Sequence, residues 1–322
     1  MANNEIASGI FLIDTKPLGN EQIISSYLIQ GKEKCALVDP GFPSSADTVL
    51  KGMEGVGVKP GDLDYIILTH THIDHAGSAG IIARIAKKAK VVTHARGLFY
   101  LENSAKIGGG SKMIFGELSA GLGEPVDVPA DRILAVDEGS GIDLGGKSIQ
   151  FYYTPGHCGD HISFLEMDTK TLFTGDVSCL HYPQLGHVPI PAGSPPIYRS
   201  DFILEQLERF SKFEVKNIAT PHYGMADAKP AEYIRKNMQA VRDSRKQIDR
   251  MFRSGMEFPQ VIEKLRRSII EESGKPAGEI PDFLAGTWLP IMLRTGLMGF
   301  MADILEYARD IRPFTKFEAI PA

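Results

Sequence analysis

The heptapeptide at residues 69–75 constrains the fold and the chemistry of this chain more than any other segment. It reads Thr-His-Thr-His-Ile-Asp-His and contains three of the nine histidines in the sequence. It directly follows the β-like apolar run 65–68, and we expect a helix over residues 74–86. A strand end where a loop enters a helix is a usual place for an α/β active site. Because imidazole and carboxylate together suit zinc, iron or manganese, the segment supplies four candidate metal ligands: His70, His72, Asp74 and His75.

The composition narrows the class of protein. Of the 322 residues, 43% are hydrophobic and 23% charged, which is ordinary for a globular chain. The net charge of −5 disfavours a broad nucleic-acid surface, which would show an excess of Lys and Arg. The cysteines Cys35, Cys158 and Cys179 form no CxxC pair, and their odd number excludes a complete disulfide framework. No basic-plus-apolar leader and no apolar run of membrane-spanning length is recognised, so we expect a cytoplasmic protein without membrane partners.

The pattern of the chain changes near residue 228. We expect a catalytic domain over residues 1–228 and a helical region over 229–322. The first part alternates short strands with helices, and its helices are expected from Ser44 or Ser45 to Met53 and over 201–210. The Gly-rich stretch 107–123 shows weak periodicity and is either a flexible surface loop or part of a pocket wall or lid. Strands are expected at 10–13, 23–29, 35–38, 65–68, 90–93, 133–136, 149–154, 162–165, 171–173 and 217–219.

Three proline-led apolar stripes follow in the second part. Pro230 opens a helix that ends near Gly255, and Pro259 and Pro290 open two more. These stripes pack either on the first domain or across a homodimer. If they close one wall of a pocket, Phe283, Trp288 or Met292 would set the size of the substrate.

Three further metal-capable residues follow strands. His157, Asp176 and His222 come after the runs 149–154, 171–173 and 217–219, each beside Gly or Pro. Singly, each residue has a structural explanation, such as a core histidine or a helix cap. Loops that leave the same edge of a sheet bring their side chains together, so the recurrence favours one metal centre shared with the heptapeptide.

With these residues in place, the chain resembles the metallo-β-lactamase superfamily. The HxHxDH motif is present as His70, His72, Asp74 and His75, and the later motifs of the family as His157, Asp176 and His222, in the expected order. The resemblance covers roughly residues 6–225. It implies an α+β fold, the αββα sandwich, in which two mixed sheets pack face to face with helices outside. The C-terminal helical region is additional to that fold.

The resemblance also implies a role for each residue. His70, His72 and His157 would bind one metal, and Asp74, His75 and His222 a second, with Asp176 bridging the two. Asp39 matches a family position that orients a ligand histidine, although a simple turn residue before Pro40-Gly41 has the same appearance. The implied cofactors are two divalent ions per chain, with Zn²⁺ expected first and Fe or Mn as alternatives.

The residues near these motifs have less specific interpretations. Cys158 is adjacent to His157, and we expect it to point elsewhere. His161 is expected to be structural or to support a ligand. His181 or Tyr182, in a Pro-rich stretch after Asp176, would donate to a developing oxyanion, or the stretch is a rigid surface loop. Tyr223 would line the pocket.

The expected reaction is hydrolysis of a small ester, thioester or lactone by a hydroxide that bridges two metals, with Asp74 holding the nucleophile and moving its proton. The run from His157 to Phe164 and the helical tail are similar to the glyoxalase II and acyl-homoserine lactonase branch. Two alternatives remain: a di-iron protein of the same fold with redox or oxygen chemistry, and a metal-retaining regulatory protein that binds a ligand. The tail is unlike a flavodoxin domain, and His72 stands where flavodiiron proteins usually carry Glu.

Overall fold

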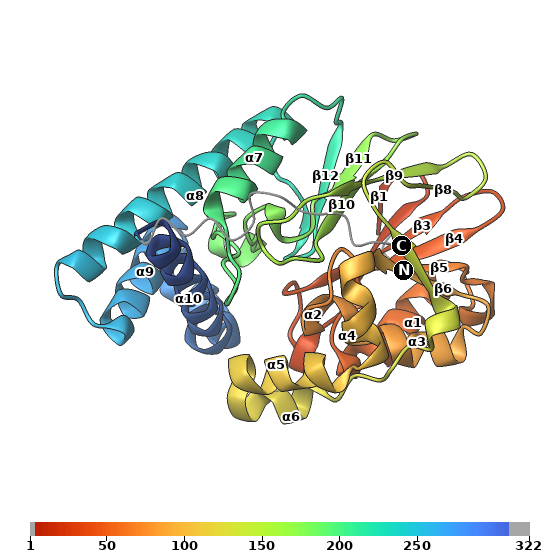
Figure 1. The fold of residues 1–322 in the computed structure, drawn as a ribbon, viewed down its shortest axis with the longest axis horizontal. Helices are drawn as coiled ribbons and strands as arrows, with labels where there is room; N and C mark the ends of the chain where they lie inside the picture. The colour runs from red at the N-terminus through yellow and green to blue at the C-terminus, as the bar shows by residue number, and fades with distance from the viewer. Residues whose placement is uncertain (1–3, 309–322) are drawn as a thin grey trace.

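Two mixed β-sheets form the centre of the protein (Figure 1). The structure is a computed structural model that describes residues 4–308. The first sheet has the order β1 (Glu5–Ala7), β2 (Ile10–Asp14), β3 (Ser25–Gln30), β4 (Cys35–Val38), β5 (Tyr65–Ile67), β6 (Lys90–His94) and β7 (Ile133–Val136). The second has the order β13 (Gly224–Met225), β12 (Asn217–Thr220), β11 (Thr171–Phe173), β10 (Ile162–Glu166), β9 (Ser148–Tyr153) and β8 (Gly141–Asp143). β4 to β7 run parallel, as do β11 and β12.

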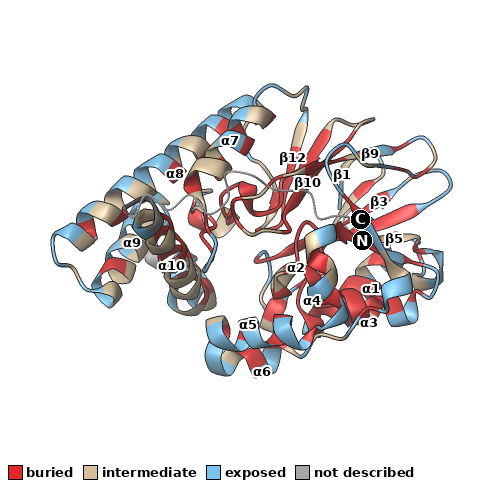
Figure 2. Ribbon diagram, in the orientation of Figure 1, coloured by how far each residue is buried: buried red, intermediate tan, exposed pale blue. Residues whose placement is uncertain are grey.

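The period-two alternation of the strands explains why the sheets stack. In β4, Ala36 and Val38 face the second sheet, whereas Leu37 belongs to the core on the opposite face. Phe151, Phe164 and Phe173 fill the space between the sheets from the other side. Figure 2 shows that both sheets are largely buried, as expected when each is covered on two faces.

Helices cover the two outer faces, which completes the αββα sandwich. The outer core of the first sheet includes residues of α1 (Ala46–Gly55) and α3 (Ala79–Ile85). The outer core of the second includes residues of α7 (Ser200–Phe210), α8 (Pro230–Arg253) and α9 (Phe258–Glu272). The remaining α-helices of the described residues are α2 (Ile73–Ala76), α4 (Leu98–Glu102), α5 (Ala105–Phe115), α6 (Ser119–Leu122) and α10 (Leu289–Ala308), and the π-helix Phe283–Trp288 precedes α10.

The last helix joins both outer cores. Leu289 and Leu293 of α10 pack with the first core, and Leu297 and Phe300 with the second. The helix therefore uses two apolar faces inside the protein, which accounts for its richness in apolar residues. A homodimer through these helices, and the division into domains at residue 228, stay predictions.

The structure differs from the sequence-based expectations at one Gly-rich stretch and one helix. The Gly-rich stretch is the helix α5, followed by short turns and α6, because Ile107 and Phe115 are buried against the core and offset the low helix propensity of its glycines. The helix expected over 74–86 is divided into α2 and α3 near Gly77, where a β-carbon would lie 2.5 Å from Pro43.

The expectation that no segment reaches membrane-spanning length was also wrong. The helical stretch Phe283–Leu305 is long and apolar enough by length and composition, with 44% of its most apolar window buried inside the protein. Arg294 interrupts the run in the sequence, which conceals its length. Asp303 on this stretch is fully buried and accepts from Arg245 and Ser200, an arrangement that fits a helix packed within a protein core.

Candidate metal centre

The seven candidate ligands lie at the ends of four strands. The heptapeptide follows β5, and His157, Asp176 and His222 follow β9, β11 and β12. The face-to-face packing of the two sheets brings these strand ends together at one edge of the sandwich. The sequence pattern therefore corresponds to a single cluster in space.

One group of donor atoms forms around His72. Its Nδ1 lies 2.9 Å from His70 Nε2 and 2.9 Å from His157 Nε2. The Oδ2 atom of Asp176 lies 3.5 Å from His157 Nε2. Three imidazole nitrogens and one carboxylate oxygen thus converge from separate parts of the chain.

A second group forms around the other oxygen of Asp176. Its Oδ1 lies 3.6 Å from His75 Nε2 and 3.4 Å from His222 Nε2. The Oδ2 atom of Asp74 lies 3.6 Å from His75 Nε2 and 3.7 Å from His222 Nε2. Asp176 therefore presents one oxygen to each group, in the manner of a bridging ligand.

Several atoms in these two groups lack hydrogen-bond partners, as expected of metal ligands. His75 Nε2, His222 Nε2 and Asp176 Oδ1 are buried without a hydrogen-bond partner, and each such buried polar group costs about 1–3 kcal/mol. Around a tetrahedral zinc ion, neighbouring ligand atoms lie about 3.3 Å apart, close to the observed separations. A cation in each group would satisfy the unpaired atoms and remove the repulsion between converging lone pairs.

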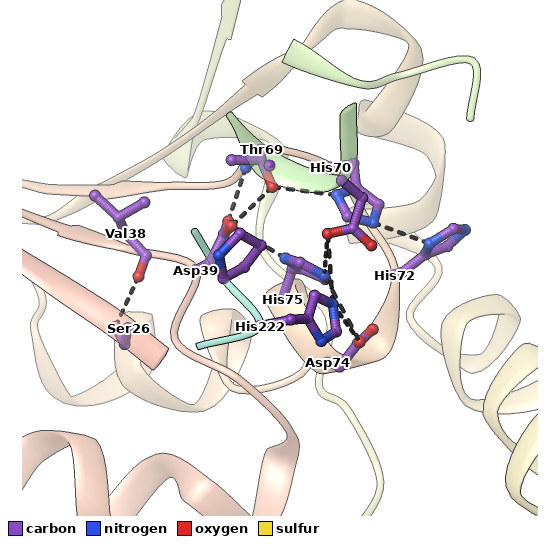
Figure 3. A network of polar contacts seen from close by, with 12 residues as sticks. Ser26, Val38, Asp39, Thr69, His70, His72, Asp74, His75 and His222 are labelled. Carbon is purple, nitrogen blue, oxygen red and sulfur yellow. Dashed lines mark hydrogen bonds and ion pairs between the residues drawn. The ribbon is translucent and has the colours of Figure 1, made fainter. Parts of the chain in front are cut away.

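Asp39 and Thr69 orient the rings of two candidate ligands, His75 and His70 (Figure 3). Asp39 Oδ2 accepts from His75 Nδ1 at 3.0 Å and from the Thr69 hydroxyl at 2.7 Å. Because the Thr69 hydroxyl donates to Asp39, its oxygen accepts from His70 Nδ1 at 3.1 Å. Both rings are thereby fixed in the tautomer that turns the Nε2 lone pair toward the cluster.

His157 receives the equivalent support from a loop. Its Nδ1 donates to the carbonyl oxygen of Ala192 at 2.7 Å. That leaves the Nε2 lone pair of His157 facing the first group of donor atoms. Ala192 could not be identified from the sequence, because a backbone carbonyl carries no residue signature.

His161 supports Asp176 and does not reach the donor groups. Its Nε2 accepts from the Asp176 backbone N–H at 2.9 Å. Its Nδ1 therefore carries the proton and donates to the Thr154 hydroxyl at 2.8 Å. The structural role expected from the sequence agrees with this geometry.

The electrostatics of the cluster differ between its histidines: although burial opposes it, the carboxylates of Asp74, Asp176 and Asp39 raise the pKa of His75 well above its ordinary value. Burial lowers the pKa of His157 to about 3 and holds that of His70 well below its ordinary value. Burial opposes ionisation of Asp176 as well, but His222, His75 and His157 hold the pKa of its carboxyl well below the ordinary value. Neutral imidazole and ionised carboxylate are the forms that bind metals.

A cavity of about 580 Å³ opens over the cluster. Its floor includes five of the candidate ligands, namely His72, Asp74, His157, Asp176 and His222. Its walls come from α5, from the loop 192–197 and from Met292 and Thr295 of α10. The Gly-rich stretch thus forms a pocket wall, one of its two expected roles, and of the three residues expected from the helical region only Met292 lines the cavity.

Cys158 lies differently from the expectation. Its sulfur is within 4.8 Å of the donor atoms of His70, His72 and His157, and the residue lines the cavity. Burial, and then the neighbouring Asp160, raise the pKa of the thiol well above its ordinary value. The group is therefore protonated at neutral pH and is a poor nucleophile.

Three residues expected at the pocket lie outside its lining. Tyr182 is buried, and its hydroxyl accepts from Trp288 Nε1 at 2.9 Å. His181 donates from Nδ1 to the Tyr223 carbonyl at 2.9 Å and contacts His187 with its other nitrogen. The side chain of Tyr223 contacts Asp14.

Asp160 is a supporting residue that the sequence reasoning missed. Its Oδ2 accepts from the Thr71 backbone N–H at 2.9 Å and from the Thr71 hydroxyl at 2.7 Å. These two hydrogen bonds fix the heptapeptide at Thr71, between its first two histidines. Its place between His157 and His161 in the sequence was the available signal.

Comparisons with known proteins agree with this geometry. A model of the metallo-beta-lactamase superfamily matches residues 19–222. The match spans more than half of the chain, and the protein belongs to this superfamily.

Several known proteins are similar to this chain. The metallo-beta-lactamase fold-containing protein ST1585 of Sulfurisphaera tokodaii is 29% identical over 248 residues, which cover 75% of this chain and 88% of that protein. Its crystal structure has a TM-score of 0.66 and covers 91% of this chain and 98% of its own, at 24% identity. The family protein TTHA1429 of Thermus thermophilus has a TM-score of 0.62 at 19% identity, covering 94% of this chain and 95% of its own. Diflavin flavoprotein A 1 of Synechocystis is 30% identical over 167 residues, 51% of this chain and 25% of that protein.

Proposed function

We propose that the protein is a dinuclear metal hydrolase that cleaves a small ester, thioester or lactone. The observation that carries the proposal is the placement of Asp176, whose two oxygens face two separate groups of donor atoms on the floor of the cavity. Two divalent ions held there, with zinc expected first, would supply an activated water at neutral pH and polarise the scissile carbonyl.

The residues of the chain would divide the remaining work. Asp74 lines the cavity with 14% of its side chain exposed, so its carboxylate can hold the attacking water and take its proton. Asp39 and the Ala192 carbonyl keep His75 and His157 oriented. The walls exclude water and position the acyl group.

The walls of the cavity support an acyl substrate. Ile107, Ile114 and Phe115 of α5 line the cavity together with Leu180 and with Met292 of α10. An apolar wall above a polar floor suits an acyl chain with its reactive carbonyl at the metals. Within the superfamily, this favours the branch similar to glyoxalase II and acyl-homoserine lactonases.

Elemental analysis and a substrate panel test the proposal together. Protein purified without added metal or chelator is expected to hold about two zinc ions per chain in this centre and to hydrolyse members of a panel of esters, thioesters and lactones. Asp74→Asn is expected to lose most turnover, whereas Asp131→Asn, an exposed aspartate outside the cavity, keeps it. Full turnover in Asp74→Asn would refute the mechanism. Retained metal without turnover on any substrate would favour the regulatory alternative.

The second candidate is an iron-loaded centre of the same fold, and the similarity to a diflavin flavoprotein favours redox chemistry. The same nitrogen and carboxylate donors bind iron. Visible absorption of the purified protein, with iron in the elemental analysis and consumption of oxygen on reduction, would favour it. A colourless zinc protein would exclude it.

A further inference from the structure

A separate group of donor atoms lies behind the metal centre. His181 Nε2 lies 2.7 Å from His187 Nδ1 and 3.6 Å from Asp227 Oδ1. Their donor atoms all lie within 4.8 Å of one another. None of the three residues lines the cavity over the centre described above.

The hydrogen bonds of His181 leave its Nε2 directed toward His187 and Asp227. Its Nδ1 donates to the Tyr223 carbonyl at 2.9 Å, so Nε2 is the nitrogen of this ring that can bind a metal. The one proton on His187 Nδ1 can satisfy the contact with His181. The carboxylate of Asp227 also faces His181 Nε2, at 3.6 Å from its Oδ1 atom. Among the described residues no hydrogen-bond donor to that carboxylate is found.

The geometry repeats that of the main centre. A histidine whose far nitrogen donates to a backbone carbonyl is typical of metal ligands, and His157 is held in the same way by Ala192. His187 is kept in position by a left-handed backbone, with φ of 59°. Burial, and then His181, lower the pKa of His187, which keeps the ring neutral and able to bind a metal.

We propose that His181, His187 and Asp227 form a further metal site that takes a divalent ion with nitrogen and oxygen preference, zinc first among them. Two imidazoles and one carboxylate match zinc sites with an open position for water. Asp227 is 39% exposed at its side chain, so the ion has access from solvent. Lys275 is the nearby cation that opposes binding.

The ion would stabilise the segment that carries a ligand of the main centre. The backbone N–H of His181 donates to the His222 carbonyl, and the Tyr223 N–H donates back to the His181 carbonyl. A metal on the His181 side chain would therefore connect three segments: the loop after β11, the turn that carries His222, and the residues before α8. Its role is structural, because the three side chains do not reach the cavity.

Metal counting on matched variants tests the site. The full chain is loaded with excess Zn²⁺ and desalted, and zinc per chain is measured for the wild type, His187→Ala, Asp227→Asn and the control Asp131→Asn. We expect His187→Ala and Asp227→Asn each to hold one zinc ion fewer than the wild type, and the control to be unchanged. With Co²⁺ in place of zinc, the difference spectrum should show the lost site.

Equal zinc in all four proteins would overturn the proposal, as would an equal loss in the control. If His187→Ala does not fold, the isosteric Asp227→Asn decides the question. The result is read as a difference between variants. It is therefore independent of whether the main centre is hydrolytic.

Discussion

The contact between α10 and the loop that carries Ala192 gives a sharp prediction. A β-carbon added at Gly299 would lie 2.5 Å from Ser194 N and 3.1 Å from Tyr198 Cβ. The obstructing atoms include backbone, so the loop itself must move. Because Ala192 in this loop accepts from His157 Nδ1, Gly299→Ala should disturb a metal ligand.

A second glycine on the same helical stretch provides the control. Gly286 has no heavy atom within 4 Å of an added β-carbon. Both substitutions stabilise the helix by about 0.5–1 kcal/mol through helix propensity. Only Gly299→Ala also destabilises the fold by overpacking, by about 1–3 kcal/mol. The free energies of unfolding of the two variants should therefore differ by about 1–3 kcal/mol. Disturbing the partner of a ligand histidine should also weaken metal binding by about 10-fold to 100-fold.

Two measurements check this prediction. Urea denaturation of the metal-free variants gives the difference in free energy of unfolding, and competition with a chelator gives the zinc affinity. If Gly299→Ala matches Gly286→Ala in both, the claim that α10 positions His157 is wrong. Lower stability with unchanged zinc affinity would show that the contact is structural only.

Three further predictions follow from the site. Asp39→Asn removes the charge that His75 Nδ1 faces at 3.0 Å and should weaken zinc binding by about 10-fold to 100-fold; affinity equal to that of Asp131→Asn would contradict it. In the metal-free protein, burial lowers the pKa of both His157 and His161 from 6.5 to about 3, so the unfolded chain binds more protons than the folded one between these values. The contribution of these two histidines to the free energy of unfolding should therefore fall as pH decreases from 6.5 toward 3 and be complete above 6.5; urea titrations at pH values between 3 and 6.5 check this, and His161→Gln should make the dependence shallower. Met292→Trp narrows the cavity between α5 and α10 and should lower kcat/KM for long acyl esters more than for acetyl esters; an equal loss for both would show that this wall does not select substrates.

Most of the strands follow from the sequence because they are short, apolar and bounded by turn residues. The bounds expected at 35–38, 133–136 and 171–173 are those of β4, β7 and β11. The strands β1, β8 and β13 were not predicted, since they are short and, unlike the equally short β5 and β11, contain no two adjacent large apolar residues. The helix α5 was missed because Gly108, Gly109 and Gly110 weaken a pattern that tertiary packing then restores.

The candidate site, like the fold, could be predicted only in part from the sequence. The seven donor residues could be selected from the sequence because metal ligands need particular side chains next to strand ends. The groups that orient these donor residues could not all be identified from the sequence. Ala192 acts through its backbone, and Tyr182 was assigned to the pocket although its hydroxyl is bonded to Trp288, which is 106 residues away.

The position of α10 in the chain has a consequence for how the centre matures. All seven donor residues precede α10, so a ribosome completes them before the helix that supports the Ala192 loop exists. The support for His157 is therefore the last part of the centre to be put in place. Tight metal binding at the proposed centre would therefore depend on completion of the fold.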